Sequence, residues 1–185
     1  MIPKKPWAAY IGGMITAIIE TRDDEVGLAH ALAALVPAAT EGIVREVVVI
    51  DRGSSDGTLT VADTAGCTII EARKVAGDPL RRAAEAARGD WLLFLSPSAS
   101  LQPGWQGAAM AFIDDALVTG TARSRVAHLR RGGIRSGWWS QLLARVSRGD
   151  GHLVAKAAYL AAGSSPSSSL SSSASSVSGA RRGAA

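Results

Sequence analysis

The sequence predicts an α/β fold with a mostly parallel sheet flanked by helices. Short apolar runs of strand length alternate with segments of helical periodicity, and polar loops follow the runs. The chain has 185 residues, 47% of them hydrophobic and 19% charged, which suits one domain with a core. Alternation of strand and helix favours parallel strands with helices on both faces of the sheet.

Each expected strand is a short apolar run that ends at polar residues or glycine. The runs are residues 14–20, 46–50, 67–70 and 91–95. Runs this short are typical of buried strands rather than helices.

Helices are expected between these strands, over residues 26–36, 56–65 and 79–88. We expect Pro37 to end the first helix, since proline disrupts a helix interior. Asp56 can cap the second, and Gly66 stops it. Gly89 follows the third.

The pattern is less regular after Ser100. The expected segments there are a helix over 104–118, a strand pair within 119–135, an amphipathic helix over 138–148 and a short helix over 153–163. We therefore divide the chain into an N-terminal extension (1–13), a folded domain (14–163) and a Ser-rich tail (164–185). The tail is expected to be disordered, because it lacks the apolar content that offsets ordering entropy.

Charge and cysteine content restrict the possible partners. The net charge of +4 permits, but does not require, binding to phosphate-bearing ligands or an anionic membrane surface. Cys67 is the only cysteine, which excludes an internal disulfide and a Cys/His zinc cluster and favours the cytoplasm. The apolar run 7–19 is too short to span a membrane and lacks a signal-peptide cleavage site.

Ligands of such sheets bind at the carboxyl ends of the strands, so the loops 21–25, 51–58 and 96–100 are the places to search. Asp51 ends a strand, where its carboxylate can accept from a base N–H or from ribose hydroxyls. Gly53 permits a tight turn, and Ser54 adds a small donor. A plain strand–turn–helix connection with a capping aspartate is an equally good interpretation of this loop.

A dinucleotide-binding Rossmann domain is excluded by the first loop. That domain requires G-x-G-x-x-G between its first strand and helix, whereas this chain has the acidic, glycine-free sequence TRDDE over 21–25. A P-loop is also absent. A bound nucleotide would therefore be held by its base and ribose.

Three blocks in order resemble family 2 glycosyltransferases. IIETRDDEVGLAHALAAL resembles that family's opening strand, P-T-x-N-E loop and helix. VVVIDRGSSDGT resembles V-V-D-D-G-S-x-D-G-T, and ARGDWLLFLSPSASLQPGW resembles the stretch that leads to the metal-binding D-x-D. The nearest subgroup comprises small bacterial transferases that read L-L-F-L-H-A-D-T at the third block.

The resemblance implies a GT-A fold and transfer of a sugar from a nucleotide-diphosphate sugar to an acceptor hydroxyl. Asp51 matches the carboxylate that contacts the base. The implied donor-binding residues are Thr21, Arg22, Asp23, Glu25, Asp51, Gly53, Ser54, Arg81, Arg82 and Ser98.

The metal-binding motif departs from the family. Glu20, Asp23 and Arg52 replace a proline, an asparagine and an aspartate, and Ser96 and Ser98 stand where the D-x-D aspartates belong. The family implies Mg²⁺ or Mn²⁺, but neutral hydroxyls are weak ligands for hard cations, so no metal is expected here. Arginines at 81, 82 or 88 are alternative cations for the diphosphate.

The acceptor side departs as well. Gly149-Asp150-Gly151-His152 followed by AAYLAAG resembles the family's G-D-Q-G segment, which makes Asp150 and His152 candidates for the acceptor side. The resemblance ends at Gly163, and the tail has no acidic residue to act as general base. We therefore expect a truncated, frameshifted or non-catalytic relative.

The segment 123–148 combines arginines with Trp138 and Trp139. Packed tryptophans with solvated arginines are the preferred interpretation, and an interfacial helix on anionic lipid is the alternative. The latter suits a lipid-linked acceptor at the inner membrane face, and a small-molecule acceptor is equally compatible. No nucleic-acid motif is present. The leading hypothesis is a glycosyltransferase with impaired catalysis, and the rival is a non-catalytic nucleotide-sugar-binding module.

Overall fold

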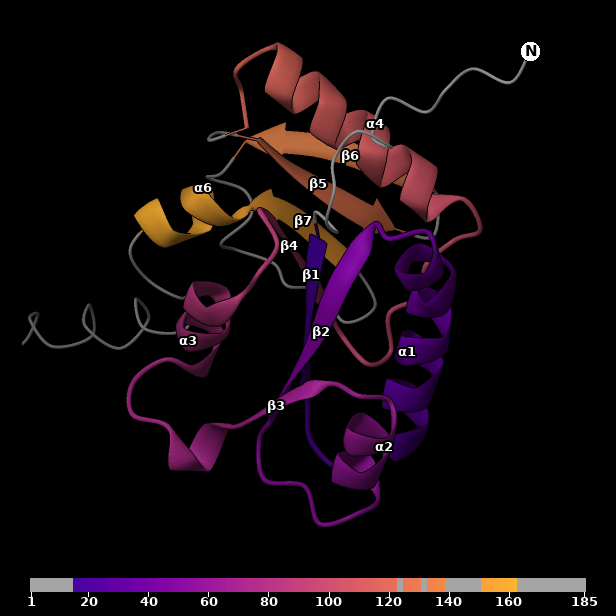
Figure 1. Ribbon diagram of the computed structural model, residues 1–185, viewed down its shortest axis with the longest axis vertical. Coiled ribbons are helices and arrows are strands. Elements are labelled where there is room, and N and C mark those ends of the chain that lie inside the picture. The colour runs from indigo at the N-terminus through magenta and orange to yellow at the C-terminus, as the bar shows by residue number, and fades with distance from the viewer. Residues whose placement is uncertain (1–14, 123–124, 131–132, 139–150, 163–185) are drawn as a thin grey trace, which may run out of the picture.

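The computed structural model describes residues 15–122, 125–130, 133–138 and 151–162 (Figure 1). The expected N-terminal extension over 1–13 and the expected tail over 164–185 lie outside the described residues. So does the expected helix over 138–148, apart from its first residue.

The described strands form one seven-stranded sheet in the order β3-β2-β1-β4-β7-β5-β6 (Figure 1). Strands β1 to β4 are mutually parallel, whereas β7 is antiparallel to β4 and β5, and β5 is antiparallel to β6. The α/β class with its parallel half is thereby confirmed. The strands are β1 (Ile15–Thr21), β2 (Val44–Asp51), β3 (Thr68–Glu71), β4 (Trp91–Leu95), β5 (Arg125–Arg130), β6 (Gly133–Trp138) and β7 (Gly151–Ala155).

Helices cover both faces of this sheet. They are α1 (Glu25–Thr40), α2 (Thr58–Thr64), the short 3₁₀ helix η2 (Ala72–Lys74), α3 (Pro79–Ala86), α4 (Trp105–Val118) and α6 (Lys156–Ala161). Trp91 packs edge-on against Phe112 of α4, while Phe94, three residues along the same strand, packs against Tyr159 of α6. Because side chains alternate along a strand, α4 and α6 lie on opposite faces.

Contacts between helices show which face of the sheet α1 and α3 cover. Trp105 Nε1 of α4 donates to the Ala34 carbonyl of α1 at 3.4 Å, so α1 shares the α4 face. Arg81 of α3 reaches the Leu160 carbonyl of α6 at 3.5 Å, so α3 shares the α6 face. None of the helices in the described ranges has the length and hydropathy needed to cross a membrane.

The sequences of the two central strands, β1 and β4, are mostly apolar without alternation because both faces of each strand are covered. Ile18 and Ile19 are 1% and 0% exposed although they point to opposite faces, and Leu92 and Leu93 are both fully buried. A strand covered on both faces favours apolar side chains at consecutive positions.

The prediction that Pro37 ends the first helix is wrong. Helix α1 continues through Pro37 to Thr40. Proline removes one N–H donor, but its own carbonyl still accepts, here from the Glu41 N–H at 3.0 Å. Ala38 is fully buried, so core packing holds the last turn in place.

The prediction of a helix over 153–163 is also wrong in its first part. Residues up to Ala155 belong to β7, which pairs with β4 and β5, and helix α6 begins only at Lys156. A short apolar run does not separate a strand from a helix by periodicity. Pairing with β4 on one edge and β5 on the other makes this run a strand.

The strand pair expected within 119–135 is confirmed as β5 and β6, with bounds shifted toward the C-terminus. Trp138 ends β6, so it does not begin a helix. The expected helix over 104–118 is confirmed as α4.

A buried polar cluster ties β1 and β2 to the turn before β4. Thr16 Oγ1 donates to Glu46 Oε1 at 2.9 Å and accepts from the Gly89 N–H at 2.9 Å. Glu46 also accepts from Arg88 Nε at 2.7 Å. Burial raises the pKa of Glu46, but hydrogen bonds from Arg88 and Thr16 outweigh it and lower that pKa overall.

Candidate functional site

Thr21 and Asp51 form the buried centre of the site, at the carboxyl ends of the adjacent strands β1 and β2. They are register partners and are 3% and 2% exposed. Thr21 Oγ1 has no hydrogen-bond partner among the described residues. A buried hydroxyl is costly without a partner, so a group outside the described residues is expected to supply one.

The Asp51 carboxylate is held by its own loop. Oδ2 accepts from the Gly53 N–H at 3.0 Å, and Oδ1 accepts from the Ser54 N–H at 3.1 Å. Gly53 has a φ of +91°, which glycine adopts without strain. The turn therefore fixes the carboxylate at the strand end while leaving lone pairs free.

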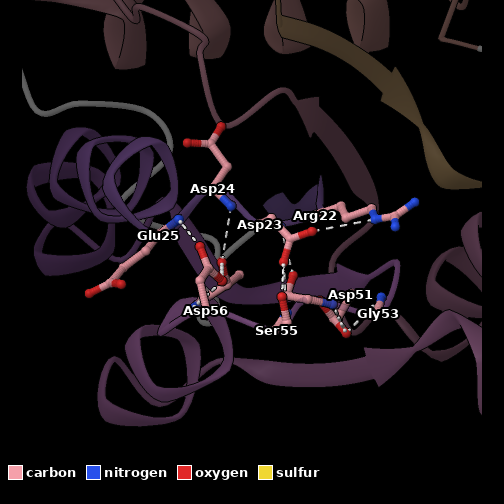
Figure 2. A network of polar contacts seen from close by, with 10 residues as sticks. Arg22, Asp23, Asp24, Glu25, Asp51, Gly53, Ser55 and Asp56 are labelled. Carbon is pink, nitrogen blue, oxygen red and sulfur yellow. Dashed lines mark hydrogen bonds and ion pairs between the residues drawn. The ribbon is translucent and has the colours of Figure 1, made fainter.

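Asp23 joins the loop after β1 to the loop after β2 (Figure 2). Its N–H donates to Ser54 Oγ at 2.9 Å, and its Oδ1 accepts from the Ser55 N–H at 2.7 Å. The hydrogen bonds from the Ser55 backbone and hydroxyl lower the pKa of Asp23. Asp23 has a φ of +48°, a conformation that aspartate tolerates better than most residues.

Asp56 and Asp24 accept backbone N–H groups in the same network (Figure 2). Asp56 Oδ1 accepts from the Thr58 N–H at 3.0 Å and Oδ2 from the Glu25 N–H at 3.2 Å. The hydrogen bond from the Thr58 hydroxyl is the main cause of the lowered pKa of Asp56. Asp24 caps α1 by accepting from the Gly27 N–H. The prediction that Asp56 caps the second helix is wrong, because Gly57 occupies the N-cap of α2; Asp56 lies one residue earlier and accepts from the N–H of Thr58, the first residue of α2.

Two arginines border this edge. Arg22 is exposed and pairs with Asp23 at 3.5 Å (Figure 2). Arg52 contacts the Glu20 carboxylate. The residues that replace the family's proline and second aspartate therefore pair with each other.

Ser96 and Ser98 follow β4 and bond to each other, with their hydroxyl oxygens 2.9 Å apart. The residues described contain no group of three histidine, cysteine or acidic side chains arranged to hold a metal ion. Two neutral hydroxyls do not supply the anionic oxygen ligands that Mg²⁺ or Mn²⁺ requires. The site therefore does not fit the metal that the family pattern implies.

The structure does not bring Arg81 into contact with the Asp51 loop. Arg81 pairs with Glu85 one turn along α3 at 2.9 Å and reaches α6. Arg82 is exposed on the same helix.

On the expected acceptor side, Asp150 lies outside the described residues. His152 is 5% exposed, and its Nδ1 lies 3.1 Å from Nδ1 of His128, its register partner on β5. His128 is half-buried beside His152. No sequence signal joins these two residues, which are paired only by the sheet.

The comparison with known families agrees with this architecture. A parallel half-sheet whose carboxyl edge carries the Thr21 and Asp51 loops, extended by antiparallel strands, defines a GT-A fold of the glycosyltransferase class. Residues 16–153 match the family described as glycosyl transferase family 2. Since this match spans most of the chain, the protein belongs to that family.

Solved structures with similar folds include glucosyl-3-phosphoglycerate synthase from Mycobacterium tuberculosis bound to Mn²⁺, UDP and glucosyl-3-phosphoglycerate. It is 22% identical, with a TM-score of 0.47, and the match covers 64% of this chain and 44% of that chain. A second, a mycobacterial protein, is 24% identical with a TM-score of 0.49, covering 64% and 41%. The chain thus spans less than half the length of either. No curated protein matches it.

Proposed function

We propose that this domain binds a nucleotide-diphosphate sugar at the edge formed by Thr21 and Asp51, and that it transfers the sugar to an acceptor hydroxyl with impaired catalysis. The observation that carries the proposal is the buried Asp51 carboxylate beside the Thr21 hydroxyl. Family membership supplies the reaction class.

The chemistry of the edge suits a nucleoside. A fixed carboxylate accepts strongly from the N–H of a base or from ribose hydroxyls. The Thr21 hydroxyl can donate or accept beside it. The hydrogen bonds among Asp23, Ser54 and Ser55 hold the two loops together before a ligand arrives, which lowers the ordering cost of binding.

Impairment follows from the loop after β4. In the family, a metal held there by aspartates stabilises the leaving diphosphate, and Ser96 and Ser98 cannot hold it. No step of our proposal involves a metal. Arg22 and Arg52 border the same edge and are alternative cations, although both already pair with carboxylates.

We propose that the acceptor binds near β5 and β7. Strand β7 begins beside Leu95, the last residue before the loop after β4, and His152 is its second residue. The acceptor is a small molecule or a lipid-linked group. Contact with a membrane would involve the segment around Trp138 and Trp139. Co-sedimentation with anionic liposomes, before and after Trp138→Ala and Trp139→Ala together, tests that contact: equal pelleting of both proteins excludes it.

The main test is calorimetry of UDP and GDP with and without Mn²⁺. We expect binding of one nucleotide with a Kd that Mn²⁺ leaves unchanged. Absence of binding by either nucleotide would contradict the proposal.

A non-catalytic nucleotide-sugar-binding module is the second candidate, favoured by the Ser96–Ser98 hydrogen bond that replaces a metal site. Product analysis with nucleotide sugars and simple acceptors separates the two. Slow, metal-independent product formation supports transfer, and binding without product supports the module. Turnover that rises with Mn²⁺ would rule out the metal-free site.

A further inference from the structure

Helix α1 is apolar on its solvent side as well as on its core side. The core side holds Leu28, Ala31, Leu35 and Ala38, which are buried. The solvent side holds Val26, Ala29, Ala33, Val36 and Pro37, which are exposed. These five residues recur mostly at intervals of three and four, so they lie along one side of the helix. We call them the outer stripe.

The outer stripe contains no charged residue, and the only charged residue of α1 is Glu25, at its start. A surface helix usually turns charged side chains to solvent, as α3 does with Arg82 and Glu85. In contrast, Val26 and Val36 of α1 are 67% and 58% exposed. A helix that is apolar all round is typical of one packed on all sides, so a further segment is expected to cover the outer stripe.

The chain enters β1 beside the C-terminal end of α1. Ile15, the first residue of β1, donates its N–H to the Ile43 carbonyl at 3.1 Å. The Ile43 N–H in turn donates to the carbonyl of Ala38, in the last turn of α1, at 2.8 Å. The residues that precede Ile15 in the sequence are therefore tethered next to the outer stripe.

The composition of these preceding residues matches an apolar surface. Residues 6–14, PWAAYIGGM, carry no charge and include Trp7, Tyr10 and Ile11. Tryptophan and tyrosine contribute the most apolar area per residue when they pack against a surface.

The length of the segment fits as well. The four steps from Ile15 back to Ile11 span up to about 13 Å, which exceeds the helix width of about 10–12 Å. Gly12 and Gly13 permit the turn that this path requires. The four steps from Ile11 to Trp7 span about another 13 Å, roughly half the length of about 24 Å that 16 helical residues give α1.

We propose that the outer stripe of α1 is a docking surface for residues 7–11 of the same chain, which pack over Val36 and Pro37. This surface lies at the edge of the sheet where β1 begins, whereas Thr21 and Asp51 lie at the edge where β1 and β2 end. The docking is therefore independent of the proposed nucleotide binding.

A second copy of the chain fits this surface less well. A stripe about 24 Å long and about 10 Å wide offers about 240 Å², whereas a stable interface buries about 800 Å² on each partner. A short tethered segment needs no such area, because the tether supplies a high effective concentration.

Thermal melts of the full chain in a double-mutant cycle test the proposal. Trp7→Ala and Val36→Ser should each lower the melting temperature by roughly 2–4 °C, because each removes one side of the same apolar contact. The double variant should fall no further than the larger single effect, since the contact is lost only once. Val118→Ser is the matched control: Val118 is 86% exposed on α4, outside the outer stripe. Val118→Ser should leave the melting temperature unchanged, and the full effect of Trp7→Ala should persist in its presence.

A Trp7→Ala variant that melts like the wild type would overturn the proposal. Additive losses in the Trp7→Ala, Val36→Ser double variant would also overturn it, because they would show that the two residues do not touch. Light scattering that finds a wild-type dimer dissociated by Val36→Ser would assign the outer stripe to a second copy and overturn the docking of residues 7–11. A monomeric wild type with the non-additive pattern supports it.

Discussion

The loops after β1 and β2 and the loop after β4 occupy the same edge of the sheet but differ in construction. In the first pair, aspartates accept backbone N–H groups of the neighbouring loop and of the helices that follow, and Asp24 caps α1. In the loop after β4, two serine hydroxyls bond to each other.

The difference separates carboxylates that build the fold from carboxylates that only bind ligands. Asp24 and Asp56 accept from N–H groups at the N-termini of α1 and α2, so these two carboxylates stabilise the fold. Aspartates at 96 and 98 would serve a metal and not the fold. The sheet therefore tolerates serine at these two positions.

The largest expected effect concerns the nucleotide edge. Asp51→Asn keeps an oxygen for the Gly53 and Ser54 N–H groups but removes the charge, so nucleotide affinity should fall about 10- to 100-fold. Calorimetry measures the change, with Asp63→Asn, an exposed position on α2, as control. Unchanged affinity in Asp51→Asn would place the nucleotide elsewhere.

The next effect concerns the polar cluster at the opposite ends of these strands, which ties β1 and β2 to the turn before β4. Thr16→Val removes the hydroxyl that joins Glu46 to the Gly89 N–H. The Glu46 carboxylate and the Gly89 N–H each lose that hydrogen-bond partner. We expect the free energy of unfolding to fall by about 1–3 kcal/mol. Denaturant titration measures it, with the exposed Thr60→Val as control. A loss no greater than that of the control would show that the cluster does not stabilise the sheet.

Restoring carboxylates should sharpen the contrast. Ser96→Asp together with Ser98→Asp supplies anionic ligands at the loop after β4, so Mn²⁺ should strengthen nucleotide binding about tenfold in this variant only. Ser100→Asp adds a carboxylate outside the motif and controls for charge. If the double variant remains indifferent to Mn²⁺, the loop geometry and not only its chemistry has diverged.

The smallest effect is a pH dependence of the nucleotide edge. Folding lowers the pKa of Asp23, so its contribution to stability is complete above the ordinary aspartate value of about 3.9 and is lost as pH falls through the lowered pKa. Because Asp23 is exposed, the loss is small. Melting temperatures of wild type and Asp23→Asn should converge as the pH drops from 7 to 3. A constant gap would mean that the Asp23 charge does not stabilise the fold.

In the first half of the chain, the hydrophobic pattern and the loop residues predicted the strands correctly. The runs 14–20 and 91–95 became β1 and β4, because strands buried on both faces are apolar throughout. Local rules failed where burial outweighed them. Ala38 keeps α1 helical past Pro37, and strand pairing on both edges makes residues 151–155 a strand.

The sequence by itself determined the family, the order of the first strands and helices, and the loss of the D-x-D aspartates, because these depend on local periodicity and on residue identity at a motif. Only the tertiary structure decided which side chains meet. Arg73, which follows β3, packs against Gly53, which follows β2. His128 of β5 lies beside His152 of β7, and the two histidines are 24 residues apart in the sequence. Such contacts depend on strand order and register, which no local sequence window contains.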